Sequence, residues 1–157
     1  ESFAEEVLIE VLELPELRLP RPPPPDPGPE AGTVSTLRFE WINQRGSSQY
    51  GAKETITIPA ADRFLTLSGY AYDAAPVARG SAVYIEMDGK LRPAEYGLPS
   101  HGISIVQGKP ELELCGFRWT TPLWRLPAGP HVFRIVMISP GGQRHYVSEE
   151  TIRLQVQ

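Results

Sequence analysis

Residues 64–72 read FLTLSGYAY, and residues 81–87 read SAVYIEM and run into Asp88-Gly89. Apolar or small side chains occupy every second position of both stretches: Leu65, Leu67, Gly69 and Ala71 in the first, and Val83, Ile85 and Met87 in the second. A period of two places these side chains on one face of an extended strand. Asp-Gly is a favoured pair for a tight hairpin. The two stretches therefore predict two half-buried strands, the second followed by a hairpin.

Similar runs recur outward from this centre, with turn residues between them. They lie at 36–42, 54–58, 116–121, 131–139 and 152–157, and turns are expected at 127–130 and at Gly141-Gly142. The segment 91–114 has weak periodicity and predicts a long loop with one helical turn. Together the runs predict about seven strands and no helix between them. Such alternation is typical of antiparallel sheets with one dry face.

The composition supports the same class of fold. Gly and Pro number 31 of the 157 residues, and proline is excluded from helix interiors. We therefore expect an all-β protein, an immunoglobulin-like antiparallel β-sandwich of about seven strands over residues 33–157. The length is sufficient for one domain with a sizeable core.

The N-terminal part has a different character. Residues 5–14 read EEVLIEVLEL, in which β-branched residues at alternate positions favour a strand. Residues 15–32 hold eight of the 17 prolines, including four in succession at 22–25, which favour a stiff polyproline spacer. An SH3-type ligand is the alternative for this run. We predict an acidic arm at 1–14, a Pro-rich linker at 15–32 and a sandwich at 33–157.

Charge separates the same parts. Residues 1–30 hold eight acidic residues and two arginines, a net charge of -6, whereas the remaining 127 residues hold 11 acidic and 13 basic residues, a net +2. The body lacks the dense basic patch that nucleic-acid binding needs, so we exclude that class of partner. No apolar run is long enough to span a membrane. No signal peptide is visible at Glu1, which is compatible with a chain that begins after a cleaved or omitted segment.

The stretch from Leu67 onward resembles a known kind of domain. The matching elements are Ser68 to Asp73 (SGYAYD), Val83 to Gly89 (VYIEMDG), Ala94 to Gly97 (AEYG), Gly116-Phe117 and Leu126 to His131 (LPAGPH). They are similar to bacterial immunoglobulin- or fibronectin-like domains attached to surface or membrane proteins, including glycosyltransferase-like ones. The pattern departs at Pro99-Ser100-His101 and in Tyr70, which replaces a Trp. The resemblance implies an extracytoplasmic location, peripheral to a membrane at most, and no catalytic residue.

No residue set predicts catalysis, a metal site or a cofactor. The three histidines, His101, His131 and His145, lack metal-ligand spacing, and we expect His131 to cap a turn. Glu86 and Asp88 share the outward face of one strand, which suits a solvated face or, alternatively, a carboxylate pair. The single cysteine, Cys115, excludes a disulfide framework and is expected to be a small buried side chain.

Aromatic side chains form the candidate ligand-binding set. Exposed indole and phenol rings stack on sugar rings, and the outward phase of 64–72 and 81–87 predicts neighbouring tyrosines on one surface. The candidate ligand-binding residues are Tyr70, Tyr72, Tyr84, Tyr96 and Trp124. The alternative is that these rings cover a second sheet, the linker or a partner. We expect Trp41 and Trp119 in the core.

Two functions follow from this pattern. The first is a non-catalytic structural or protein-interaction module, whose arm at 1–14 pairs with a partner protein or neighbouring domain or completes a sheet. The second is a carbohydrate-binding module of a glycan-processing enzyme, which requires an exposed aromatic strip. An enzyme in its own right is not expected, since no nucleophile, base or metal set is present.

Overall fold

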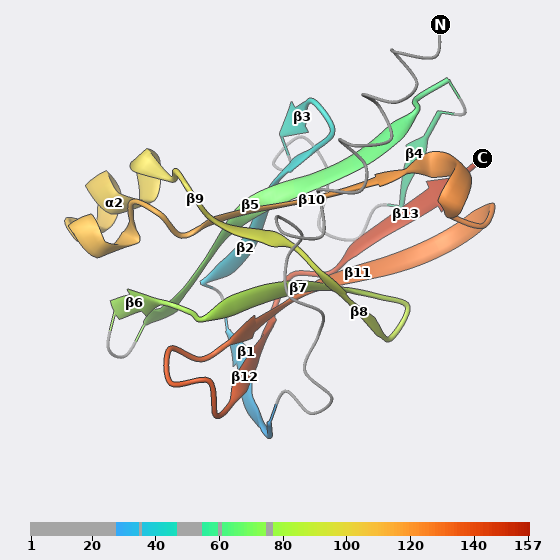
Figure 1. Ribbon diagram of the computed structural model, residues 1–157. Coiled ribbons are helices and arrows are strands. Elements are labelled where there is room, and N and C mark those ends of the chain that lie inside the picture. Colours follow the sequence, from blue (N-terminus) through green and yellow to red (C-terminus); the bar gives the residue numbers. More distant parts are fainter. Residues whose placement is uncertain (1–27, 35, 47–54, 60, 75–76) are drawn as a thin grey trace, which may run out of the picture.

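The computed structural model describes residues 28–34, 36–46, 55–59, 61–74 and 77–157 (Figure 1). The arm at 1–14 and most of the linker at 15–32 lie outside the described residues, so their predicted structures remain predictions. β1 begins at Glu30, within the range that the sequence assigned to the linker. The side chains of Thr33 and His101 also lie outside the described part.

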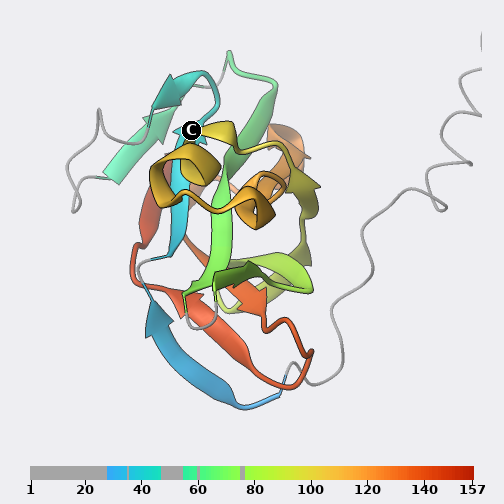
Figure 2. The same cartoon turned by 90° about the vertical axis from the view of Figure 1, so that its left-hand side faces the viewer.

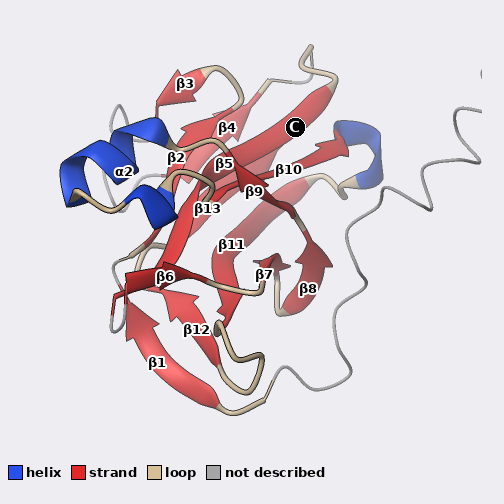
Figure 3. Ribbon diagram, turned by 60° about the vertical axis from the view of Figure 1, so that its left-hand side comes forward, coloured by secondary structure: helices blue, strands red, loops and turns tan. Residues whose placement is uncertain are grey.

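The described chain is all-β with three short helical elements, as the alternating runs predicted (Figure 3). The strands are β1 Glu30–Val34, β2 Leu37–Ile42, β3 Arg45–Gly46, β4 Thr55–Ile58, β5 Phe64–Ala74, β6 Val77–Arg79, β7 Ala82–Met87, β8 Lys90–Pro93, β9 Glu95–Leu98, β10 Gly116–Pro122, β11 Gly129–Ile138, β12 His145–Ser148 and β13 Ile152–Val156. The helical elements are α2 His101–Gln107 and the single 3-10 turns η3 Pro110–Leu112 and η4 Leu123–Arg125. The thirteen described strands exceed the expected seven because several short strands lie at sheet edges.

The strands form two sheets. In the seven-stranded sheet, the order is β1-β12-β11-β13-β4, with β7 beside β11 and β8 beside β7. β11 is antiparallel to β7, β12 and β13, whereas β1 is parallel to β12 and β4 is parallel to β13. The six-stranded sheet has the order β3-β2-β5-β10-β9, and β6 pairs with the end of β5.

One long strand changes neighbours along its length. β11 pairs with β13 over Gly129 to Phe133 and with β12 over Val136 to Ile138. Ser148 fills the junction, because its Oγ accepts a hydrogen bond from Ile135 N at 2.9 Å and donates one to Glu150 O at 2.7 Å. β12 and β13 therefore continue one another along β11, and β1 and β4 lie along the same side of the sheet (Figure 1).

The inward faces of the two sheets meet in one main core. The predicted alternation of β5 is confirmed, since its inward residues Leu65 and Leu67 are fully buried. Phe39 and Phe117 pack edge to face in this core, with ring centroids 6.0 Å apart. Gly69 lies where β2 approaches β5 so closely that an added Cβ would be 1.9 Å from Arg38 O. The core thus depends on a glycine at that point.

The hairpin after residue 87 is also confirmed. Asp88 and Gly89 both have positive φ, 51° and 85°, and join β7 to the antiparallel β8. Positive φ at both central residues matches the twist of the flanking strands, and Asp and Gly tolerate it best.

The prediction of a long loop at 91–114 is wrong. This segment contains part of β8, all of β9, the two-turn α2 and η3 (Figure 2). Ile103 of α2 packs against a small cluster of Tyr72, Leu112 and Cys115, and Gly108, whose φ is 62°, caps the C-terminus of α2. Elements of three to seven residues are too short for a clear period, which explains the error.

Trp41 is also misplaced by the sequence prediction. The pairing of β2 with β5 shifts register between Phe39 and Trp41, which is a β-bulge. Ile42 therefore takes the inward position, and Trp41 is 50% exposed. Trp119 does pack against the core, and its ring lies 5.9 Å from that of Phe133.

Candidate binding site

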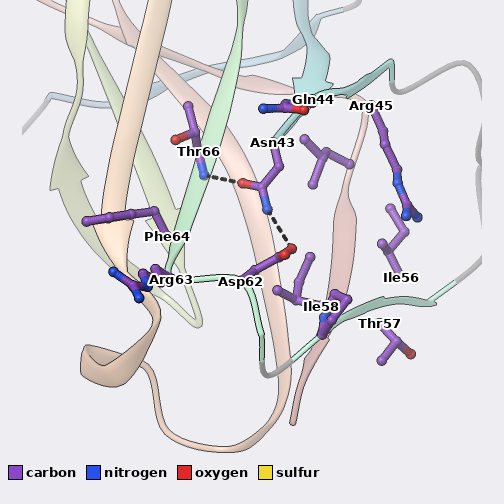
Figure 4. A pocket seen from close by; sticks show the side chains of 12 residues that line it. Asn43, Gln44, Arg45, Ile56, Thr57, Ile58, Asp62, Arg63, Phe64 and Thr66 are labelled. Carbon is purple, nitrogen blue, oxygen red and sulfur yellow. Dashed lines mark hydrogen bonds between the residues drawn. The ribbon is translucent and has the colours of Figure 1, made fainter.

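A groove opens between the last strands of the two sheets. We call it the edge groove; it has a volume of about 530 Å³ and lies between the β2–β3 turn, β4 and the start of β5 (Figure 4). Its lining residues are Ile42, Asn43, Gln44, Arg45, Ile56, Thr57, Ile58, Pro59, Asp62, Arg63, Phe64 and Thr66. The groove thus joins one end of the six-stranded sheet to the β4 edge of the seven-stranded sheet.

Asn43 fixes one wall of the edge groove. Its φ of 55° is in the left-handed region, which asparagine tolerates better than most residues. Thr66 N donates a hydrogen bond to Asn43 Oδ1 at 2.7 Å, and Asn43 Nδ2 donates to Asp62 Oδ2 at 3.3 Å. Figure 4 shows both bonds. The β2–β3 turn is therefore held to the β5 side of the groove.

The floor and the rim of the edge groove differ chemically. Ile42, Ile56 and Ile58 are buried and belong to the core, so the floor is apolar. Arg45 and Arg63 are exposed and lie on different sides of the groove, and Asp62 is the single carboxylate among its described lining residues (Figure 4). The described rim is therefore basic over an apolar floor.

A second depression continues from the first. This Trp124 hollow, of about 550 Å³, shares Ile58, Pro59, Asp62, Arg63 and Phe64 with the edge groove. It adds Pro122, Leu123, Trp124, Leu126, Ala128, Val156 and Gln157. The two depressions together form one continuous surface at this end of the sandwich.

Two exposed aromatic rings belong to the Trp124 hollow. Trp124 is 78% exposed and Phe64 is 55% exposed. Leu123 N donates to Arg63 O at 2.9 Å, which ties η4 to the segment before β5. The Arg125 guanidinium lies 5.1 Å from the centre of the Trp124 ring in a cation–π contact. Trp124 is therefore presented on an anchored turn.

The exposed tyrosine strip expected from the alternation is not formed. Tyr72 is 8% and Tyr84 is 4% exposed. β5 and β7 belong to different sheets, so these rings are not neighbours. Tyr72 stacks on the half-buried Tyr70, with centroids 6.0 Å apart, and is covered by the cluster that includes Leu112. Tyr84 packs with Val136 and Ile138 on the outer face of the other sheet.

Tyr96 has a structural role in the described fold. Its hydroxyl donates to Ala71 O at 2.6 Å and accepts from Gly80 N at 2.9 Å. Burial is the main cause that raises the pKa of Tyr96 far above its usual value. Of the five predicted ligand-binding residues, Trp124 alone is classed as exposed, and the structure does not bring the five together.

His131 is engaged at both ring nitrogens. Nδ1 lies 2.6 Å from Asp88 Oδ2, and Nε2 lies 2.7 Å from Pro127 O. Burial acts to lower the pKa of His131, but the hydrogen bonds to Pro127 and Asp88 and the charge of Asp88 outweigh it and raise the pKa. Neither nitrogen is directed at a serine in the described part, and the ring links two turns.

The other candidate polar residues also have separate structural partners. Glu86 Oε1 accepts from Arg134 Nε at 2.9 Å and from Nη2 at 2.6 Å, so Glu86 and Asp88 do not form a joint site. Cys115 is buried beside Ser100 Oγ at 3.1 Å, and burial raises the pKa of its thiol. Among the described residues, no group of three His, Cys, Asp or Glu side chains could hold a metal ion.

The sequence prediction missed four residues of this surface: Arg45, Asp62, Arg63 and Phe64. Phe64 shares the outward phase of β5 with Thr66 and Ser68, and this phase was the available signal for its exposure. The three charged residues flank turns, where sequence alone does not show that two distant turns share one groove.

Comparisons with known proteins found little similarity. No protein-family model matches the chain, and a search of curated proteins found no match. Among solved structures, the chain has a weak match to the endo-beta-1,4-mannanase from Thermotoga petrophila, at 11% identity and a TM-score of 0.44. The match covers 67% of this chain and 18% of the mannanase chain. In the part of the chain that the structure describes, no helix is long and apolar enough to cross a membrane.

Proposed function

We propose that this chain is a non-catalytic structural and protein-interaction module, an immunoglobulin-like sandwich in a bacterial extracytoplasmic protein. The observation that carries the proposal is the edge groove, where a basic rim surrounds an apolar floor at an open sheet edge. Such a surface suits a polypeptide strand, which offers backbone hydrogen bonds and alternating apolar side chains. The location follows from the sequence resemblance.

Site-specific cross-linking in the parent protein tests this function. A photoreactive residue at Thr57, on the exposed face of β4 beside the edge groove, is expected to cross-link to another protein or domain, identified by mass spectrometry. The matched control is Lys90, which is also exposed and lies on β8. Equal labelling at both positions, or no protein cross-link from Thr57, would contradict an interaction role for the groove.

A carbohydrate-binding module is the second candidate, and the exposure of Trp124 and Phe64 favours it. Aromatic faces beside Asp62, Arg63 and Gln157 supply both stacking and hydrogen-bonding groups for a sugar. Binding to a panel of defined oligosaccharides is measured by titration calorimetry with the full chain. Trp124→Ala is expected to abolish binding, whereas Trp41→Ala removes an exposed Trp elsewhere and is expected to retain it. An absence of binding across the panel counts against this candidate.

A further inference from the structure

β4 has one unused hydrogen-bonding edge in the described structure. It pairs with β13 through Thr55 to Ile58, and it ends the strand order of its sheet, so no described strand pairs with its outer edge. An open edge of this kind is a template for a further strand. The edge borders the edge groove, whose floor includes Ile56 and Ile58.

The side chains needed at this position are specific. A strand added to β4 would direct alternate side chains toward the edge groove and the others toward solvent. The apolar floor of the groove requires apolar side chains at the positions of the added strand that face the groove. Residues 5–14, EEVLIEVLEL, place the β-branched Val7, Ile9 and Val11 on one face, with Leu8, Glu10 and Leu12 on the other. This segment therefore matches the floor in pattern.

The charges also match. Among the described lining residues, the groove carries the exposed Arg45 and Arg63 against the single carboxylate of Asp62. Residues 5–14 contain four glutamates, Glu5, Glu6, Glu10 and Glu13, and no basic residue. Opposite charge on two surfaces favours their association and fixes the partner more than it adds affinity. An acidic strand is thus preferred over a neutral or basic one.

The length of the spacer permits docking within the same chain. Gly28 is held beside β12, because its carbonyl oxygen lies 2.8 Å from His145 Nδ1. Glu30 pairs with His145 and Thr55 with Arg153. These partners lie opposite Ile138 and Val132 of β11, so the start of β4 is six residues, or roughly 20 Å, further along the sheet at about 3.3 Å per residue. Residues 15–27 span about 40 Å as polyproline at about 3.1 Å per residue. The spacer is long enough to bring the arm back to β4.

The directions of β1 and β4 determine the orientation in which the arm at residues 5–14 would pair with β4. β1 and β4 run the same way, because each is parallel to one of the consecutive strands β12 and β13. Residue 28 precedes β1 at the end of the sheet away from β4. A spacer that returns from β4 to that end runs against β1, so an arm continuous with it is antiparallel to β4.

We propose that residues 5–14 of the same chain bind as an antiparallel strand to the outer edge of β4, with Val7, Ile9 and Val11 over the edge groove. The inference rests on the proposed function, in which the arm is an interaction element, and it names the surface that receives it. A linked arm has a high effective concentration at its own edge. A partner strand would compete for this same edge.

Disulfide trapping in the full-length chain tests the proposal. In a Cys115→Ala background, Thr57→Cys is combined in turn with Leu8→Cys, Glu10→Cys and Leu12→Cys, which share the face opposite the groove. At least one pair is expected to form an intramolecular disulfide, seen as a monomer with altered mobility on a non-reducing gel. Lys90→Cys with the same three partners is the matched control and is expected to remain reduced. A disulfide between two chains, or none with any pair, overturns the proposal.

Hydrogen exchange of the chain with its natural Cys115 provides a second test that does not depend on the cysteine variants. The amides of 5–14 and 55–58 are expected to be protected together, and the Arg45→Glu, Arg63→Glu double variant is expected to exchange about fivefold faster in 5–14. Unprotected arm amides overturn the inference. Protected arm amides without any partner cross-link from Thr57 would support the inference and contradict the proposed function. A partner cross-link from Thr57 with unprotected arm amides would support the proposed function and overturn the inference.

Discussion

His131 Nδ1 lies 2.6 Å from Asp88 Oδ2, while Nε2 of the same ring lies 2.7 Å from the carbonyl oxygen of Pro127. Both neighbours are hydrogen-bond acceptors, so both contacts are hydrogen bonds only when the imidazole carries a proton on each nitrogen. The resulting imidazolium joins the β7–β8 hairpin to the turn before β11. Asp88 also accepts from Val132 N at 2.8 Å, which completes the link.

Protein stability is expected to depend on pH through this pair. The pKa of His131 is raised in the fold, so its contribution is fully present below the unfolded value of about 6.5 and is lost as pH rises through the folded pKa. Burial acts to raise the pKa of Asp88, but its bonds from His131 and Val132 and the charge of His131 lower it, so its contribution is lost as pH falls through that lowered value. Urea unfolding between pH 3 and pH 9 should show greatest stability on the acidic side of neutrality. A flat profile above pH 6 would contradict the protonated state.

Asp88→Asn removes the negative charge of residue 88 and is expected to preserve the turn. Asn tolerates the positive φ of residue 88 and its side-chain oxygen can still accept from Val132 N. The substitution removes the charge that favours the imidazolium, so the pH at which stability declines should shift downward. NMR titration of the His131 ring measures its pKa directly in both proteins. An unchanged pKa of His131 would show that the hydrogen bond to Pro127 O, and not Asp88, stabilises the protonated ring.

Tyr96→Phe is expected to lower the free energy of unfolding by about 1–3 kcal/mol. The variant leaves two backbone groups, Ala71 O and Gly80 N, without the tyrosine hydroxyl in a largely buried place. Tyr146→Phe is the matched control, because the hydroxyl of Tyr146 makes a longer bond of 3.3 Å to Asp73 Oδ2. Equal losses in the two variants, measured by urea unfolding, would contradict the structural role of Tyr96.

Gly69→Ala and Gly141→Ala should differ strongly in thermal stability. An added Cβ at Gly69 would be 1.9 Å from the backbone oxygen of Arg38, which cannot move without displacing β2 from β5. A loss of about 2–4 kcal/mol is expected for this variant. A Cβ at Gly141 would meet no atom within 4 Å, so that variant should be neutral or gain up to about 1 kcal/mol. Calorimetric melting of both proteins measures the difference.

Local patterns predicted the centre of the fold well. The alternation of 64–72 identified the inward residues Leu65 and Leu67, and the Asp88-Gly89 pair identified its hairpin, because both signals depend on neighbours in sequence. The prediction that Trp41 lies in the core was wrong because a bulge reverses the phase of β2, and a bulge is set by the partner strand. The prediction that Tyr72 is exposed was wrong because the segment 101–115 covers the outer end of β5. The short elements of that segment give little periodic signal in the sequence.

The candidate site was less accessible to sequence reasoning. Trp124 was identified as a candidate from its loop-like flanks, and its exposure agrees with that choice. The edge groove brings Arg45 and Ile56 together on one side and Arg63 on the other, and this arrangement depends on the parallel placement of β4 beside β13. Nothing in the residues of β4 specifies a parallel neighbour almost a hundred positions later in the chain.

The parallel pairing of β1 with β12 has a mechanical consequence. β1 enters at one end of its sheet, while β13, the last strand, leaves at the opposite end (Figure 1). A pull applied between residue 28 and residue 157 therefore drags β1 lengthwise past β12. In that geometry the paired residues from Glu30 to Val34 bear the load together and cannot be peeled apart one after another. The pairing of β1 with β12 thus resists stretching of the described chain in shear.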